Sequence, residues 1–110
     1  MRHSNLCGGE IRLEFYVDKG EAKASVGVIN DFEDRPAAQC DVNQLRGVLQ
    51  GGKYHLAGPG WLCTLVRSGE MIELDLWRES QPARRCQVPV NRFAEALQEA
   101  YGVGSTAYVA

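Results

Sequence analysis

Cysteine and histidine are the residue types in this chain that most often act as nucleophiles, bases or metal ligands. No two cysteines form a CxxC pair, whereas structural zinc sites usually draw their ligands from such close pairs. Of the histidines, His3 lies in a polar N-terminal stretch and His55 lies between predicted elements. We therefore predict no metal site and no bound cofactor. The four cysteines are Cys7, Cys40, Cys63 and Cys86.

A cysteine–histidine catalytic pair would have to join His55 to a cysteine on the apolar phase of a predicted strand. Cys40, Cys63 and Cys86 all have that phase, in which a free cysteine behaves as a small hydrophobic residue. The chain also has no P-loop, dinucleotide-binding, zinc-protease or nucleophile-elbow motif. We predict a protein that is not an enzyme. The alternative is an enzyme with an unrecognised site, in which His55 works with a carboxylate.

The length and charge of the chain limit the number of domains and the kinds of partner that we expect. The 110 residues suit one domain, 1–110, with a single core. Twelve basic residues stand against 14 acidic ones, so the basic excess that favours non-specific phosphate binding is lacking. No stretch has the length and apolarity of a membrane helix, and residues 1–9 lack the apolar centre of a signal peptide. We expect a cytoplasmic protein that does not enter a membrane.

The clearest organising feature is an internal repeat. The stretch 42–50 returns 48 positions later as 90–98 and keeps its Val, Asn, Leu and Gln. Each copy resembles the end of a strand followed by a helix, with Asn43 and Asn91 as the predicted N-caps. The same shift places Ala24, Val26 and Val28 on Ile72, Leu74 and Leu76, so the inward phases of the two copies agree.

Period-two alternation predicts three strands and one helix in each copy. The repeat units are 10–52 and 58–102, with 53–60 as a linker and with 1–9 and 103–110 as loose tails. The expected fold is α+β, with two tandem β-β-β-α units, antiparallel meanders related by a pseudo-twofold axis, and helices packed at one side. The predicted strands are 11–18, 22–29, 37–42, 61–66, 71–77 and 83–90, and the predicted helices are 44–50 and 92–101.

The outward strand positions differ between the two units. In the first unit they are mostly charged, whereas in the second they include Leu62, Val66, Met71 and Trp77. Exposed apolar patches of this kind mark partner surfaces. In the alternative that we leave open, the C-terminal tail or a helix covers them.

The order of strands and helices in the two units resembles the whirly-type architecture, which also underlies the SsgA-like sporulation proteins. The resemblance lies in the duplicated meanders and most clearly in the second unit, from Trp61 to Tyr101. Whirly-type proteins bind single-stranded nucleic acid on their sheets, and SsgA-like proteins act as adaptors for other proteins. The resemblance thus implies two classes of function.

We expect a non-catalytic protein-binding module, either an adaptor or an inhibitor that masks a larger complex. A phage-borne or plasmid-borne inhibitor suits a compact acidic chain, because carboxylates can occupy a basic groove. The predicted partner-binding residues are Trp77, Met71, Val66, Leu62, Asp31, Glu33 and Asp34. Self-association is a further use of the same patch. The alternative is single-strand nucleic-acid binding through Arg12, Tyr16, Trp77, Arg78, Arg84 and Arg85.

Overall fold

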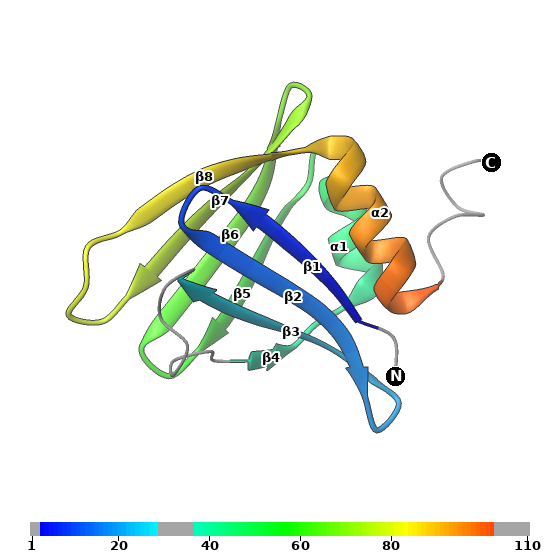
Figure 1. Cartoon of the computed structure of the whole chain (residues 1–110), viewed down its shortest axis with the longest axis horizontal. Helices are drawn as coiled ribbons and strands as arrows, with labels where there is room; N and C mark the ends of the chain where they lie inside the picture. Colours follow the sequence, from blue (N-terminus) through cyan, green and yellow to red (C-terminus); the bar gives the residue numbers. More distant parts are fainter. Residues whose placement is uncertain (1–2, 29–36, 103–110) are drawn as a thin grey trace.

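The computed structural model describes residues 3–28 and 37–102, and it describes the backbone alone for residues 3–8. Two antiparallel sheets have the strand orders β1-β2-β3-β4 and β5-β6-β7-β8, and each is followed by a helix (Figure 1). The α+β class is therefore confirmed. The elements are β1 His3–Gly8, β2 Ile11–Asp18, β3 Glu21–Val28, β4 Ala37–Gln39, α1 Val42–Val48, β5 Lys53–Gly58, β6 Trp61–Ser68, β7 Met71–Arg78, β8 Arg84–Pro89 and α2 Val90–Tyr101.

Each unit contains four strands, so the predicted β-β-β-α order was wrong. Most of the expected tail 1–9 forms β1, which pairs along β2, and most of the expected linker 53–60 forms β5, which pairs along β6. The physical reason is that these edge strands are held by backbone hydrogen bonds to a neighbour, and such bonds need no apolar alternation. In β5, for example, only Leu56 is buried. The first strands of the two sheets therefore begin at His3 and Lys53.

The predicted helix caps were also wrong. Asp41 is the N-cap of α1, and its carboxylate accepts hydrogen bonds from the backbone N–H groups of Asn43 and Gln44 at 2.9 and 3.2 Å. Pro89 occupies the N-cap position of α2 and makes no side-chain cap. Asn43 and Asn91 instead lie second in their helices. Both helices thus begin one residue before the Asn that was expected to precede them.

The registers of the β2–β3 and β6–β7 hairpins can be compared directly. Ile11 pairs with Val28 as Trp61 pairs with Arg78, so the strands correspond at a shift of 50, although the helices correspond at 48. Because the two shifts differ by two residues, the predicted inward phase is unaffected. Gly27 is thus the counterpart of Trp77. A duplication related by a pseudo-twofold axis remains a prediction.

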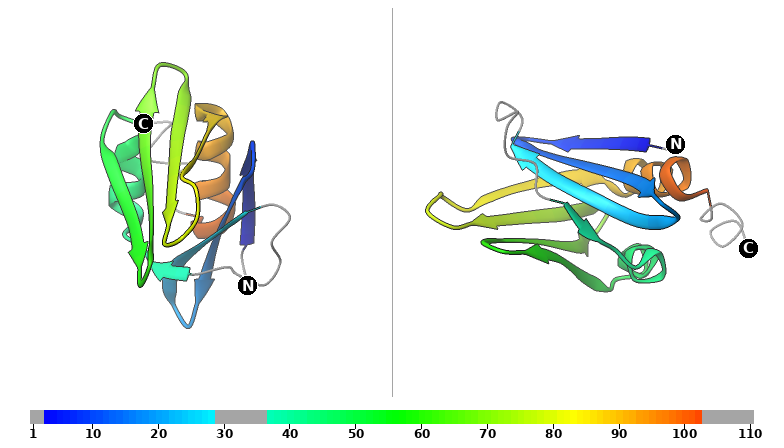
Figure 2. Two further views of the ribbon diagram at one scale, coloured as in Figure 1. Left: turned by 90° about the vertical axis from the view of Figure 1, so that its left-hand side faces the viewer. Right: turned by 90° about the horizontal axis from the view of Figure 1, so that it is seen from below.

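The two sheets lie face to face, with both helices together at one side (Figure 2). Each helix contacts the sheet of the other unit, since α2 lies against β1 and β2, and α1 lies against β5 and β6. Helix α1 is also tied to the second sheet at both ends. The Tyr54 hydroxyl of β5 accepts from the Asp41 N–H at 2.8 Å, and the Arg67 guanidinium of β6 donates to the Leu49 carbonyl.

Phe15 of β2 is fully buried in the core. Its ring meets Phe93 of α2 edge-on at a centroid distance of 5.9 Å, and it lies 5.9 Å from the ring of Tyr101. The Tyr101 hydroxyl donates to the Lys23 carbonyl at 2.8 Å and lies 3.2 Å from the Cys40 sulfur. Burial raises the pKa of the Tyr101 hydroxyl, so this group remains a donor. The first sheet and the last helix therefore share one aromatic cluster.

The predicted burial of Cys40, Cys63 and Cys86 is confirmed, and all three are free thiols. Burial raises the pKa of Cys63 to about 12 and also raises that of Cys40. The side chain of Cys7 lies outside the described residues. Neither described helix is long and apolar enough to span a membrane.

The buried thiols predict slow labelling. Because the thiolate is the reactive form, a Cys7→Ser variant should show no fast thiol towards a disulfide reagent in native buffer at mildly alkaline pH. In denaturant all three remaining thiols should react at once. A single fast thiol in the native variant would show that one of these three side chains is exposed rather than buried.

Replacing two glycines by alanine should change the stability of the fold in opposite directions. A Cβ on Gly58 would lie 2.3 Å from Nε1 of Trp61, a side chain that is only 5% exposed. Gly58→Ala should therefore lower the free energy of unfolding by about 1–3 kcal/mol through overpacking. A Cβ on Gly47 in α1 would meet nothing within 4 Å. Gly47→Ala should instead raise stability by about 0.5–1 kcal/mol. Urea denaturation measures both, and equal effects would contradict the packing at Trp61.

Candidate partner-binding surface

The outward face of β6 and β7 carries an exposed apolar pair. Leu62 and Trp77 are direct cross-strand partners, and they are 36% and 51% exposed. They are the exposed large hydrophobic side chains among the described residues, and no described helix covers them. Their phase follows from the alternation, because Cys63 and Leu76 beside them are buried. The predicted outward orientation of both residues is thus confirmed.

The other two residues of the predicted patch lie farther along the same face. Val66 pairs with Glu73, and Met71 pairs with Ser68 next to the β6–β7 turn. Both side chains are half-buried. The row of Thr64 and Asp75 separates them from the exposed pair. The four predicted residues therefore share one face but do not form one continuous apolar patch.

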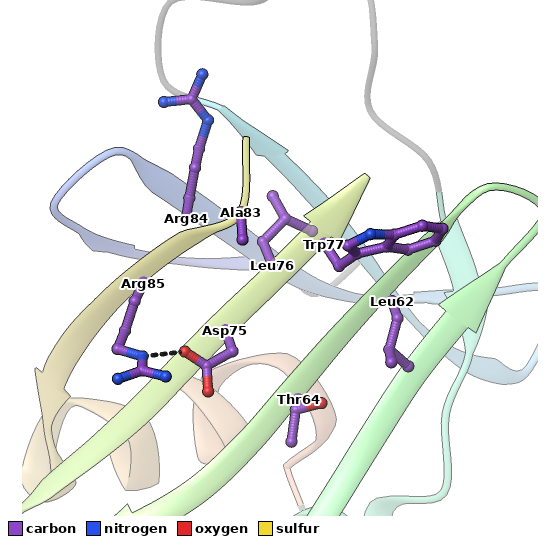
Figure 3. A pocket seen from close by; sticks show the side chains of 8 residues that line it. All are labelled: Leu62, Thr64, Asp75, Leu76, Trp77, Ala83, Arg84 and Arg85. Atoms are coloured by element: carbon purple, nitrogen blue, oxygen red, sulfur yellow. Dashed lines mark hydrogen bonds and ion pairs between the residues drawn. The ribbon is translucent and has the colours of Figure 1, made fainter. Parts of the chain in front are cut away.

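A surface hollow of about 550 Å³ adjoins the exposed pair. Figure 3 shows Leu62 and Trp77 on one side of it and the two arginines of β8 on the other. Apolar and charged side chains thus line a single depression. The lining residues are Leu62, Thr64, Asp75, Leu76, Trp77, Ala83, Arg84 and Arg85.

Each of the two arginines that line the hollow forms an ion pair with a carboxylate. Arg85 donates to Asp75 at 2.5 Å and lies 3.6 Å from Glu73 (Figure 3). The hydrogen bond to Asp75, together with the charges of Asp75 and Glu73, raises the pKa of Arg85. Arg84 pairs with Glu10 at 2.5 Å, across to the turn between β1 and β2. The positive charge of the hollow is therefore largely compensated.

His55 is exposed, as predicted, and its Nδ1 lies 3.0 Å from the Thr64 hydroxyl. A nucleophilic triad consists of a hydroxyl, a histidine that acts as its base, and a carboxylate that orients the histidine. Here the neighbouring carboxylate, Asp75, is the cross-strand partner of Thr64 and is bound to Arg85, so it does not orient the imidazole. Within the described ranges, no group of three potential ligand residues could hold a metal ion.

The residues expected to bind nucleic acid do not share a surface. Arg78 is only 5% exposed, since its phase is inward. Arg12 and Tyr16 belong to β2, whose outer face lies on the opposite side of the sandwich from Trp77. Arg84 and Arg85 alone remain beside the indole. The predicted binding residues Asp31, Glu33 and Asp34 lie outside the described residues.

Among the described residues, the first sheet has no exposed apolar pair at the matching positions. The counterparts of Leu62 and Trp77 at the shift of 50 are Arg12 and Gly27, and Gly27 is buried. The outward face of the second sheet therefore carries apolar bulk that its counterpart lacks. Sequence reasoning found Leu62 and Trp77 by their alternation. It missed the place of Ala83 in the hollow and the pairing of Glu10 with Arg84, because the alternation within 83–90 does not show which distant residues a strand meets.

Comparisons with family models, with curated proteins and with solved structures find no match to this chain.

The two tryptophans give a direct test of the surface. Trp61 is buried and Trp77 is half exposed, so Trp77→Phe should leave a blue-shifted emission that resists quenching by acrylamide. Trp61→Phe should leave a red-shifted emission that acrylamide quenches readily, provided that circular dichroism shows the variant to be folded. Resistant emission from Trp77 would mean that its indole is covered in solution.

Proposed function

We propose that the chain is a non-catalytic protein-binding module, an adaptor or an inhibitor, that contacts its partner through the outward face of β6 and β7. The single supporting observation is the exposed Leu62–Trp77 pair at the edge of a hollow. Interface hot spots are enriched in tryptophan and arginine, and they tend to lie where a pocket is ringed by polar groups. This surface has that composition.

The surrounding residues supply the rest of such a surface. Asp75, Glu73 and Arg85 form a polar rim, and the half-buried Val66 and Met71 extend the apolar contact along the face. A stable interface buries about 800 Å² on each partner, so the partner would contact the whole face in addition to the hollow. Because the side chains stand on paired strands, the surface needs little reorganisation on binding.

A cytoplasmic role, as an inhibitor carried by a phage or a plasmid, belongs to the same proposal. Its support is the compact fold and the small acidic excess of the chain. The resemblance to whirly-type and SsgA-like proteins supports a binding role in general. It does not choose between a protein and a nucleic-acid partner.

Single-strand nucleic-acid binding is the second candidate, and one observation favours it. An exposed indole beside two arginines is a platform on which a base can stack. The pairing of both arginines with carboxylates argues against it, since phosphate contacts require cations that are not already neutralised. Protein binding is therefore the stronger proposal.

Affinity capture from the native host tests the protein-binding proposal. Trp77→Ala should weaken the partner retained by the wild type by about 2 kcal/mol or more, and Leu62→Ser should weaken it by less. Because both side chains are exposed, the melting temperatures should remain close to that of the wild type. Quantitative mass spectrometry of the retained proteins measures the loss.

Tyr16→Ala provides the matched control, because it removes an aromatic side chain from the outward face of the other sheet. This variant should retain the partner. Equal retention by Trp77→Ala and the wild type would reject the proposed surface. Tight, salt-dependent binding of a fluorescent single-stranded oligonucleotide, lost in Trp77→Ala, would promote the second candidate.

A further inference from the structure

The hollow lies between two flat groups, the Trp77 indole and the Arg85 guanidinium. Leu62 and Trp77 form one cross-strand pair of the outward face, and Thr64 and Asp75 form the next. Arg85 is the β8 partner of Asp75, so it is a diagonal neighbour of Trp77 on the adjacent strand, within reach of a long side chain. Figure 3 shows the indole and this guanidinium on opposite sides of the hollow. A group that enters the hollow can therefore contact both.

The ion pair of Arg85 leaves the faces of its guanidinium open. Its Nε donates to Asp75 at 2.5 Å and lies 3.6 Å from Glu73. The N–H groups of a guanidinium lie in its plane, so this contact occupies an edge of the group, and the side chain remains 71% exposed. A flat ring can thus stack on the guanidinium without breaking the ion pair. A phosphate would instead approach a cation whose charge the two carboxylates already offset.

The charged side chains of the lining are all in ion pairs. Arg84 is paired with Glu10, as Arg85 is with Asp75. The described charged residues in and around the hollow also balance, with Lys53, Arg78, Arg84 and Arg85 against Glu10, Glu73, Asp75 and Glu79. A charged occupant would lose hydration without meeting an unpaired counterion in the lining. This balance favours an uncharged occupant.

We propose that the hollow binds an uncharged aromatic side chain of the partner protein, held between the Trp77 indole and the Arg85 guanidinium. This inference rests on the proposed function and adds the chemistry of the partner's anchor residue. Aromatic rings attract one another in offset or edge-on geometry, and a guanidinium over a ring face adds a cation–π attraction. Leu62 and Ala83 provide further apolar contacts. At about 550 Å³ the hollow is within the range of pockets that enclose small organic groups.

Titrations of the isotope-labelled full chain, followed by nuclear magnetic resonance, test this inference. The probes are three blocked pentapeptides, Gly-Ser-X-Ser-Gly, in which X is phenylalanine, cyclohexylalanine or arginine. Cyclohexylalanine matches the size of phenylalanine but has no π-system. The indole N–H signal of Trp77, assigned by its loss in Trp77→Phe, reports binding. The phenylalanine peptide should bind at least about threefold more tightly than either of the other two.

A conservative variant separates stacking from damage to the fold. Arg85→Lys keeps the positive charge beside Asp75 but removes the planar face. It should therefore remove most of the preference for phenylalanine over cyclohexylalanine, while the cyclohexylalanine peptide binds as it does to the wild type. Damage to the fold would weaken both peptides. Arg92→Lys is the matched control, because Arg92 of α2 is also exposed and paired with a carboxylate, Glu95, and this variant should keep the preference.

The outcomes distinguish this inference from the proposed function. Equal or tighter binding of the cyclohexylalanine or arginine peptide, an unchanged preference in Arg85→Lys, or no shift of the indole signal with any peptide would overturn the aromatic site. If partner capture still depended on Trp77, the binding module would stand without it. If an oligothymidine bound more tightly than every peptide and lost affinity in Trp77→Ala, the surface would be a nucleic-acid site, and both proposals would fail.

Discussion

The contact of Phe15 with Phe93 and Tyr101 is the interaction on which the rest of this fold depends. It joins β2 of the first sheet to α2, two elements that lie near opposite ends of the sequence. Helix α1 makes the reciprocal contact with β5 and β6 of the second sheet. Because each sheet is covered by the helix of the other unit, neither unit buries its inner face by itself. We infer that the two units fold cooperatively as one domain.

Because the inner face of each sheet is buried in the core, only the outer faces can contact another molecule. The outer faces are not equivalent. At Gly27 the first sheet presents a buried glycine, whereas at the matching position the second sheet presents an exposed tryptophan. Packing within the fold does not account for an indole in that position, because its neighbours Leu76 and Arg78 are the residues that face inward. The exposed indole is therefore the observation on which we base the proposed binding surface.

Electrostatics refine what that surface can recognise. A cluster of arginines beside a tryptophan indicates phosphate binding when it is considered as sequence alone. The ion pairs of Arg84 with Glu10 and of Arg85 with Asp75 change this interpretation, because they neutralise the cations where a phosphate would have to approach. The pairing of the two arginines therefore argues against a phosphate ligand at this surface.

The amino-acid sequence by itself determined the strands with strong alternation, the burial of Cys40, Cys63 and Cys86, and the outward phase of Leu62 and Trp77. These features depend on a period of two, which is local and is visible in a few residues. Only the tertiary structure decided that β1 and β5 are strands, because their pairing depends on backbone hydrogen bonds that any sequence can make. It also decided which helix covers which sheet, the burial of Arg78, and the partner of Arg84. Those outcomes depend on residues far apart in the chain, as Glu10 is from Arg84, and no local pattern encodes such contacts.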